Sequence, residues 1–330
     1  MAPGNADVSN GTRVGDGAIR IAAIRTEGLT RRFGDTIAVD GLTLSVAPGE
    51  IFGLVGPDGA GKTTTMRLLA AILDPTGGDA WVLGNSVRRD AAKVHERIGY
   101  MSQRFGLYAD LTVLENLHFY ADLCGVPRRG RAPRFEELFA FSGLGPFRNR
   151  FAGNLSGGMK QKLGLSCALV HTPGVLLLDE PTSGVDPVSR RDFWRILYRL
   201  LAEGVTIFVS TAYLDEAERC RRVGLLHRGR LLAAGSPEEV RALFRGALLE
   251  IRCGEPRRAS TLLRQAFPGA AVGLFGDRVH LGVRDLPDPA GKVEAALSGA
   301  AVPFDSVLPI PPSLEDVFVS VLGRDGGGSE

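Results

Sequence analysis

The feature that most constrains the fold is a glycine-rich stretch that begins at Gly56 and ends at Thr63. Its sequence, GPDGAGKT, has the spacing G-x-x-x-x-G-K-[ST]. A short apolar segment, residues 51–55, precedes it, and residues 62–73 follow with the apolar spacing of a helix. In such a loop the backbone N–H groups close around phosphate oxygens, and the helix N-terminus adds its positive end. The sequence therefore predicts a phosphate-binding loop in an α/β domain.

The loop assigns roles to individual residues. Lys62 would reach the β- and γ-phosphates as a compact charge, and Thr63 would ligate Mg²⁺. The alternative is a glycine-rich turn without a ligand, which the flanking strand and helix disfavour. The predicted nucleotide contacts in this stretch are Gly56, Pro57, Asp58, Gly59, Ala60, Gly61, Lys62, Thr63 and Thr64.

A second stretch, VLLLDE at residues 175–180, ends an apolar segment with two acids. In open α/β folds, ligands bind at the carboxyl ends of the strands. Asp179 would hold the Mg²⁺ shell through water, and Glu180 would orient and deprotonate an attacking water. Alone, the pair could equally be two exposed acids, but the phosphate loop favours the catalytic interpretation.

A third stretch, LSGGMKQ at residues 155–161, places Ser156, Gly157 and Gly158 before a segment with helical spacing. These groups would form a second phosphate-shaped site at a helix N-terminus. One γ-phosphate has no use for two such sites in one chain unless a second protein closes over it. The alternative is a serine N-cap followed by a flexible glycine pair.

The remaining pattern predicts the fold class. Strand-like and helix-like segments alternate up to about residue 240, which predicts an α/β domain with a parallel sheet. From there on the order of segments predicts a small α+β domain of ferredoxin-like type. The predicted strands are 19–27, 41–46, 51–55, 175–178, 206–210, 247–253, 270–276, 278–283 and 304–310. The predicted helices are 62–73, most of 106–151, the later part of 155–169, 188–202, 213–219, 257–267, 291–299 and 314–322.

Composition excludes several classes of protein. With 44% hydrophobic and 23% charged residues, the chain has enough apolar surface to bury, which excludes dominant disorder. A net charge of +2 argues against a nucleic-acid partner. No window approaches the roughly 18–20 apolar residues of a membrane span. The ends, 1–18 and 324–330, are predicted to be a disordered leader and tail without a secretory signal. The four scattered cysteines are predicted to be buried thiols.

Together these motifs resemble the nucleotide-binding domain of an ABC transporter, over about residues 20–240. LSGGMKQ matches that family's signature sequence, and GYMSQRFGLY matches its Q-loop with Gln103. Phe33 stands where the family's aromatic residue stacks on adenine. The signature and the D-loop would comprise Leu155, Ser156, Gly157, Gly158, Met159 and Gln161, and Ser183, Gly184, Val185 and Asp186. PPSLEDVFVSVLG near the end resembles the C-terminal extension of type-2 drug and polysaccharide exporter ATPases. Within that class the chain resembles most the first half of tandem YbhF-like ATPases, through GPDGAGKTT, GLYADLTVLENLHFYADL and LGPF…LSGGMKQKLGL.

The resemblance implies a P-loop NTPase fold: a RecA-like parallel sheet core, an antiparallel β-subdomain and a helical subdomain at about 104–160. The ATP-binding domain would span 19–240 and an accessory domain 241–323. ATP and Mg²⁺ would be the cofactors, with Thr63, Gln103 and Asp179 near the metal. Two such domains would sandwich two ATP molecules head to tail and drive membrane-spanning permease subunits from the cytoplasmic face of the membrane. Phe105, Leu107 and Tyr108 would contact the permease, or else would pack in the core.

One position departs from the family pattern. The family has a switch histidine after the strand 206–210, where this chain has Ala212. A methyl group donates no hydrogen bond and carries no charge. Losing one preorganised polar group of a transition state lowers the rate by ~10²- to 10³-fold. Tyr213 would point about 100° away in a helix, and His171 and His227 are predicted to be structural. Asp58, often asparagine in the family, adds negative charge near the phosphates.

The predicted catalytic positions are therefore Glu180, Gln103 and the degenerate Ala212. The resulting hypothesis is an asymmetric pair. The chain's own site binds ATP and turns it over poorly, while its signature completes a site on a second ATP-binding domain that keeps the histidine. The alternatives are a homodimeric ATPase of reduced rate and a nucleotide-dependent regulatory module with negligible hydrolysis. A soluble ABC protein of translation or DNA repair is disfavoured, since the chain has one ATPase core and no long basic stretch.

Overall fold

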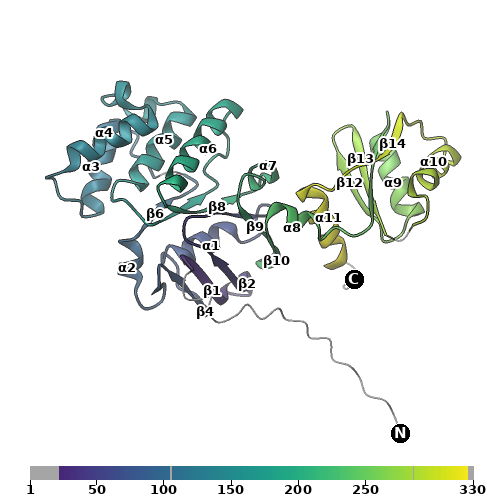
Figure 1. Ribbon diagram of the computed structural model, residues 1–330, viewed down its shortest axis with the longest axis horizontal. Helices are drawn as coiled ribbons and strands as arrows, with labels where there is room; N and C mark the ends of the chain where they lie inside the picture. Colours follow the sequence, from purple (N-terminus) through teal and green to yellow (C-terminus); the bar gives the residue numbers. More distant parts are fainter. Residues whose placement is uncertain (1–21, 105, 285, 326–330) are drawn as a thin grey trace, which may run out of the picture.

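The computed structural model describes residues 22–104, 106–284 and 286–325, with the side chains of 322–325 left aside. The predicted leader, Phe105 and residues 326–330 of the predicted tail lie outside the described residues. Figure 1 shows a larger part that contains the N-terminal elements and a smaller part at the other end of the molecule.

The larger part is built on a six-stranded sheet with the strand order β10-β9-β3-β8-β7-β6. Neighbouring strands from β9 to β6 pair in parallel, and β10 pairs antiparallel with β9. Every residue of β3, β7 and β8 is buried, as expected for central parallel strands covered on both faces. The predicted parallel sheet is confirmed. Its strands are β3 (Ile51–Val55), β6 (Ile98–Met101), β7 (Val175–Asp179), β8 (Thr206–Thr211), β9 (Arg222–His227) and β10 (Arg230–Gly235).

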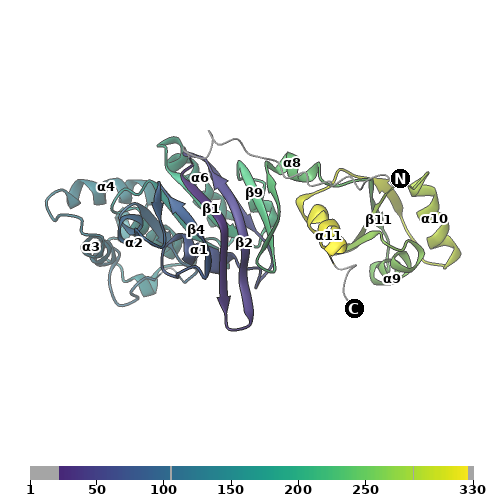
Figure 2. The same cartoon turned by 90° about the horizontal axis from the view of Figure 1, so that it is seen from below.

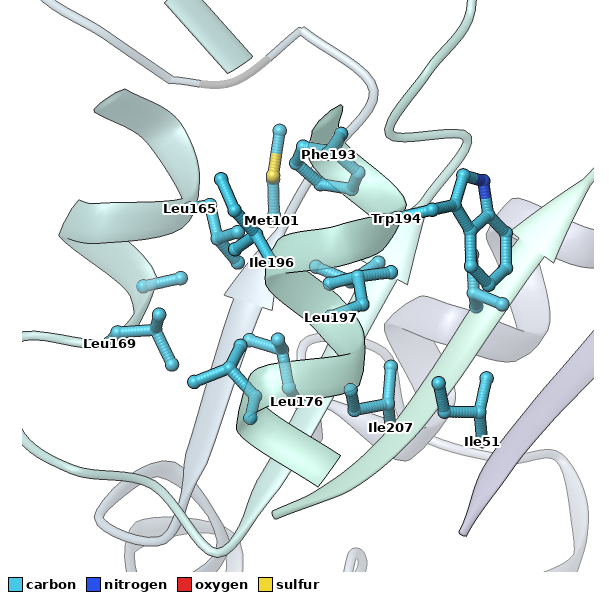
Figure 3. Packing of buried hydrophobic residues seen from close by; sticks show 14 of the residues in the cluster. Ile51, Met101, Leu165, Leu169, Leu176, Phe193, Trp194, Ile196, Leu197 and Ile207 are labelled. Carbon is cyan, nitrogen blue, oxygen red and sulfur yellow. The ribbon is translucent and has the colours of Figure 1, made fainter. Parts of the chain in front are cut away.

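Helices cover this sheet, and α6 carries much of one interface. Figure 3 shows Phe193, Trp194 and Leu197 of α6 packing above Ile51 and Ile207 of the strands. All of these side chains are buried, and burying each such side chain stabilises the fold by about 1.5–3 kcal/mol. The helices of this part near the sheet are α1 (Lys62–Leu69), α2 (Ala91–His95), α5 (Gly157–Ala168), α6 (Pro187–Ala202), α7 (Leu214–Ala217) and α8 (Pro237–Arg241).

A second, antiparallel sheet has the order β2-β1-β4-β5. Its strands are β1 (Ile24–Phe33), β2 (Thr36–Val46), β4 (Gly77–Val82) and β5 (Asn85–Ser86). The strands predicted at 19–27 and 41–46 cover only parts of β1 and β2, and residues 19–21 lie outside the described residues. β1 runs on to the tight turn at Gly34, and β2 begins straight after that turn. The alternation that suggested them is broken by register shifts in β1, so the pattern captured only part of each strand.

The segment between β6 and α5 contains two α-helices, α3 (Val113–Leu123) and α4 (Arg131–Ser142). Two short 3-10 helices follow them, η2 (Gly145–Phe147) and η3 (Ala152–Asn154). A capping box formed by Thr112 and Glu115 starts α3. The prediction of a mostly helical 106–151 was too generous, because Gly125 and Gly130 adopt positive φ and separate the two helices. The predicted helix 62–73 likewise ends at Leu69, and Ala71 adopts a φ of 52°.

The smaller part has the element order β-α-β-β-α-β and an antiparallel sheet ordered β12-β13-β11-β14. This is the ferredoxin-like arrangement that the sequence predicted. Its own apolar core includes Leu249, Val279 and Leu297. The elements are β11 (Ala247–Arg252), α9 (Pro256–Ala266), β12 (Ala271–Phe275), β13 (Arg278–Val283), α10 (Pro289–Gly299) and β14 (Ser306–Pro309).

The last helix, α11 (Leu314–Asp325), lies between the two parts, near α8 (Figures 1 and 2). Leu314 and Val317 belong to the same buried apolar cluster as the helices of the larger part. On its other side, Asp316 accepts a hydrogen bond from Nδ1 of His280 on β13 at 2.7 Å. The helix therefore contacts both parts, and it continues two residues past 323, the predicted end of the accessory domain.

Two further sequence predictions can be compared with the structure. Cys167, Cys220 and Cys253 are buried as predicted, but Cys124 is exposed, because it caps the C-terminus of α3 at the surface. Of the helices within the described ranges, none is both long and apolar enough to cross a bilayer.

Candidate nucleotide-binding site

The phosphate loop joins β3 to α1, and two of its glycines are required by close contacts. A Cβ on Gly56 would lie 2.2 Å from the carbonyl oxygen of Leu226, and a Cβ on Gly61 would lie 2.3 Å from that of Ala38. Gly61 also has a φ of 106°, which side chains rarely adopt. Gly59, with a φ of 77°, faces open space. The loop backbone is therefore fixed on one side and exposed on the other, where Pro57 and Asp58 lie at the surface.

Lys62 begins α1, and its side chain is only 3% exposed. Its ammonium group donates hydrogen bonds to the carbonyl oxygens of Gly56 at 2.8 Å and Pro57 at 3.0 Å. It also lies 3.0 Å from Oε1 of Glu180. A buried charge needs such partners. The lysine is thereby held inside the loop.

Asp179 ends β7, where it faces hydroxyl groups from two other elements. Its Oδ1 accepts hydrogen bonds from Thr63 at 3.1 Å and from Ser210 at 2.7 Å. Its Oδ2 is buried and has no hydrogen-bond partner among the described residues. Burial raises the pKa of this carboxyl, against the lowering effect of the hydrogen bonds from Ser210 and Thr63. A carboxylate oxygen with a neighbouring threonine hydroxyl is a donor set that suits Mg²⁺.

Glu180 follows directly and has a φ of 47°, rare for a residue with a side chain. Its N–H donates to the carbonyl oxygen of Ser210 at 3.1 Å and to the hydroxyl at 3.0 Å, which holds this conformation. Its Oε2 accepts a hydrogen bond from Gln103 at 3.0 Å. The structure thus brings Lys62, Gln103 and Glu180 together at one sheet edge, although 118 positions separate the first from the last (180 − 62).

The signature segment starts α5. Ser156 is the N-cap, and its hydroxyl accepts from the N–H of Met159 at 3.3 Å. Ser156 and Gly157 are exposed, so the segment presents a helix N-terminus at the surface. A Cβ on Gly158 would meet Ser189 of α6 at 2.6 Å, which explains the glycine. Leu155 is buried, as is Gln161, whose amide donates to the carbonyl oxygen of Pro181 within the chain.

The predicted D-loop connects β7 to α6. Ser183 and Gly184 are exposed, and Val185 is buried. Asp186 is the N-cap of α6, and its carboxylate accepts from the N–H groups of Val188 at 3.0 Å and Ser189 at 2.9 Å. The loop is therefore exposed in its middle and anchored at its end.

Ala212 follows β8 and is exposed, with its methyl group outside the network around Glu180. Three described side chains considered from the sequence, those of Tyr213, His171 and His227, have other partners. The ring of Tyr213 lies against the guanidinium of Arg190 at 4.5 Å. His171 contacts the carbonyl oxygen of Ile98 at the start of β6, the opposite edge of the sheet, and the ring of His227 packs edge-on to Phe318 of α11.

Two buried polar residues in or next to the site were missed by the sequence reasoning. Ser210 contacts both acids of the site, and Glu216 is fully buried beneath the end of β8. The only sequence signal for Ser210 was its place at the end of an apolar strand. Glu216 lies in an acidic helical segment, where a solvated face is the ordinary expectation, so the pattern gave no signal.

Two of the remaining predicted contacts, Phe33 and Tyr108, are exposed. Phe33 is 45% exposed near the β1–β2 turn, with the guanidinium of Arg31 4.5 Å from its ring centroid. Tyr108 is also 45% exposed and packs edge-on against Phe119. Leu107 is half-buried against the core. Phe33 and Tyr108 are therefore accessible to a partner molecule.

Comparisons with known proteins identify the family. The family profile described as "ABC transporter" matches residues 39–183. The probable multidrug ABC transporter ATP-binding protein YbhF of Escherichia coli is 43% identical over 309 residues, which cover 92% of this chain and 53% of YbhF. The chain thus spans about half the length of that relative. The daunorubicin/doxorubicin resistance ATP-binding protein DrrA of Streptomyces peucetius is 36% identical, covering 92% of this chain and 93% of DrrA.

A solved structure titled "Structure of ATP binding subunit of ABC transporter" superposes with a TM-score of 0.62 and 28% identity. It covers 67% of this chain and 93% of the other. The P-loop NTPase fold implied by the motifs is confirmed. With its phosphate loop and paired acids on the same sheet edge, this chain belongs to the ATP-binding proteins of ABC transporters, a family of ATP-hydrolysing transport ATPases.

Proposed function

We propose that this chain is the ATP-binding subunit of an exporter, which acts with membrane-spanning permease subunits at the cytoplasmic face of the membrane. The observation that carries the proposal is the assembly of Lys62, Gln103, Asp179 and Glu180 at one edge of the parallel sheet. The names of the relatives, which refer to multidrug transport and to daunorubicin/doxorubicin resistance, support the exporter class.

The donor set favours Mg²⁺ as the cofactor that accompanies ATP. Thr63 and Asp179 would hold it, with Gln103 near them, and the unpartnered Oδ2 of Asp179 is the atom that such an ion or its water would satisfy. Bound there, Mg²⁺ would neutralise charge that develops on the phosphates. Lys62 and the N–H groups of the loop would bind the same phosphates, and the exposed Phe33 would stack on the adenine.

Hydrolysis is the step that we expect to be slow in this chain. Glu180 is positioned to orient water, since Lys62 and Gln103 fix its two oxygens. Ala212 itself supplies no polar group, and the ring of Tyr213 packs against Arg190. We expect the chain's own site to bind ATP and to hydrolyse it slowly. Its exposed Ser156 and Gly157 would complete a site on a second ATP-binding domain that retains a histidine.

Mixed dimers of engineered copies test the pairing. One copy is the native chain. The other carries Ala212→His together with Ser156→Arg, so it supplies a repaired site and a blocked signature. Each copy alone is expected to turn ATP over slowly. In the mixture, the native signature would complete the repaired site, and turnover would exceed the sum of the two by about tenfold or more. Turnover equal to the sum would overturn the proposal, and adding Ser156→Arg to the native copy should abolish the gain.

Two alternatives rest on the same position, Ala212. In the first, Glu180 suffices and the chain is a homodimeric ATPase of reduced rate. In the second, the chain is a regulatory module that binds nucleotide with negligible hydrolysis. The native chain measured alone separates them, because only the homodimer shows turnover that Glu180→Gln removes.

A further inference from the structure

Glu216 has no role in the site described so far, although it lies directly beneath it. It is on α7, four residues after Ala212, and its side chain is fully buried. A buried carboxylate is costly unless hydrogen bonds and a positive charge satisfy it. The partners of Glu216 therefore indicate what keeps it there.

The two oxygens of Glu216 bond to two different segments. Oε1 accepts a hydrogen bond from the hydroxyl of Thr182, which lies between Glu180 and the predicted D-loop. Oε2 accepts one from the hydroxyl of Thr211 at 2.9 Å. Thr211 is the last residue of β8 and directly precedes Ala212. One carboxylate thus spans the chain segment that carries the catalytic glutamate and the segment that carries the switch position.

A third segment closes the arrangement. Arg190 of α6, whose N-cap is the D-loop residue Asp186, places Nε 3.4 Å from Oε1 of Glu216 as an ion pair. The same guanidinium lies 4.5 Å from the ring centroid of Tyr213 and 3.8 Å from Asp215. The opposite charge of Arg190 makes the burial of Glu216 tolerable, and it ties the start of α6 to the residues around Ala212.

The phosphate loop is connected to this arrangement as well. The hydroxyl of Thr211 accepts from the N–H of Tyr213 at 2.9 Å, while its carbonyl oxygen accepts from the N–H of Gly56 at 3.4 Å. Thr211 therefore contacts the phosphate loop, the switch segment and Glu216 at once. A displacement of any of these segments changes the hydrogen bonds of the others.

We propose that Glu216 is a positioning residue that holds the D-loop and the switch segment in a fixed relation to the phosphate loop. It touches neither nucleotide nor the reacting atoms. It acts through Thr182, on the D-loop side, and through Thr211, on the side of Ala212. Its consequence for turnover rests on the proposed function, whereas its effect on the two segments does not.

Hydrogen–deuterium exchange of the whole chain tests the coupling without relying on hydrolysis. Glu216→Gln keeps the shape of the side chain but removes its charge and leaves one acceptor oxygen in place of two. Amide exchange is expected to rise by about tenfold in both 181–186 and 211–217, since a hydrogen bond to a charged group is stronger than one to a neutral amide. A rise confined to 211–217, or none, would overturn the proposal.

Thr182→Val separates coupling from local damage. It removes only the hydroxyl on the D-loop side, yet exchange should rise at 211–217 as well, through Glu216. An effect limited to the residues around position 182 would contradict the coupling. The matched control is Glu50→Gln: Glu50 is 3% exposed, has Arg222 at 3.4 Å, and lies at the other end of β3. It should leave both segments unchanged.

A kinetic measurement adds the catalytic consequence. In the Ala212→His background, Glu216→Gln is expected to lower kcat by about tenfold, with the Kd for ATP changed less than about twofold, because the phosphate loop itself stays intact. A loss of ATP affinity with an unchanged kcat would contradict a positioning role. If Ala212→His itself gives no turnover, the proposed function fails, and the exchange result still decides the role of Glu216.

Discussion

The ends of β7 and β8 lie side by side, but the side chains at the two ends differ in the polar contacts that they make. At the end of β7, Asp179 and Glu180 make hydrogen bonds or ion pairs with Thr63, Lys62, Gln103 and Ser210. At the end of β8, Thr211 keeps its hydrogen bonds to Tyr213 and Glu216, but Ala212 offers only a methyl group. Under the proposed function, this difference would leave a site that binds nucleotide and metal but lacks one group needed for hydrolysis.

The largest expected effect is the repair of the incomplete strand end. Ala212→His restores a polar side chain beside Glu180, and we expect kcat to rise by ~10²- to 10³-fold, or about 2.7–4 kcal/mol of transition-state stabilisation. Steady-state phosphate release measures it. The gain should vanish when Glu180→Gln is added. A rate that is unchanged by the histidine would show that the two strand ends do not differ in the way described.

The next effect addresses the complete strand end and the loop that it faces. Lys62→Ala removes the buried ammonium that the phosphates would contact, and the affinity for ATP should fall by about 10²-fold. Titration calorimetry measures it. Lys93→Ala, which removes an exposed lysine paired with Asp90, is the control and should leave the affinity unchanged. If the two variants bind ATP alike, the loop does not bind phosphate as proposed.

A smaller effect separates steric contact from backbone strain in the loop. Gly59 and Gly61 both have positive φ, but only Gly61 has a carbonyl oxygen 2.3 Å from the site of a Cβ. Gly59→Ala is expected to lower the free energy of unfolding by about 1 kcal/mol, and Gly61→Ala by about 3 kcal/mol through added overpacking. Urea denaturation of both variants checks the difference. Equal losses would mean that the contact with Ala38 does not constrain the loop.

The smallest effect is the pH dependence of the buried acid at the end of β7. Burial raises the pKa of Asp179, so the folded state binds its proton more tightly than the unfolded state. Ionisation of this buried carboxyl destabilises the fold. The stability of the native chain therefore falls as the pH rises from 3.8 through the raised pKa, and it recovers as the pH falls back toward 3.8. Asp179→Asn should therefore be more stable than the native chain at pH 7, and the advantage should shrink toward pH 4.

Thermal unfolding at a series of pH values measures this difference. Asp277→Asn is the control, because the side chain of Asp277 is 88% exposed and its replacement should leave the pH profile unchanged. An advantage of Asp179→Asn that grows as the pH falls would have the wrong sign for a carboxyl whose pKa is raised.

The same comparison explains what could be predicted from the sequence. Lys62, Asp179 and Glu180 are fixed by contiguous motifs with strict spacing, so the strand, loop and sheet edge that hold them followed directly. Ser210 and Glu216 come close to the site only through the fold, because they lie 30 or more positions after Glu180 in the sequence (210 − 180). No local pattern marks them. The ferredoxin-like topology was predictable from its order of segments, whereas the placement of α11 against both parts was not.

We expect the site to bind ATP without hydrolysing it at a substantial rate. The most direct test is to saturate the native chain with Mg-ATP, to separate it rapidly from free nucleotide, and to measure the amounts of ATP and ADP that remain bound. The account predicts nearly one nucleotide per chain, recovered mainly as ATP after many minutes, with phosphate release near background. Recovery mainly as ADP, or no bound nucleotide at all, would contradict it.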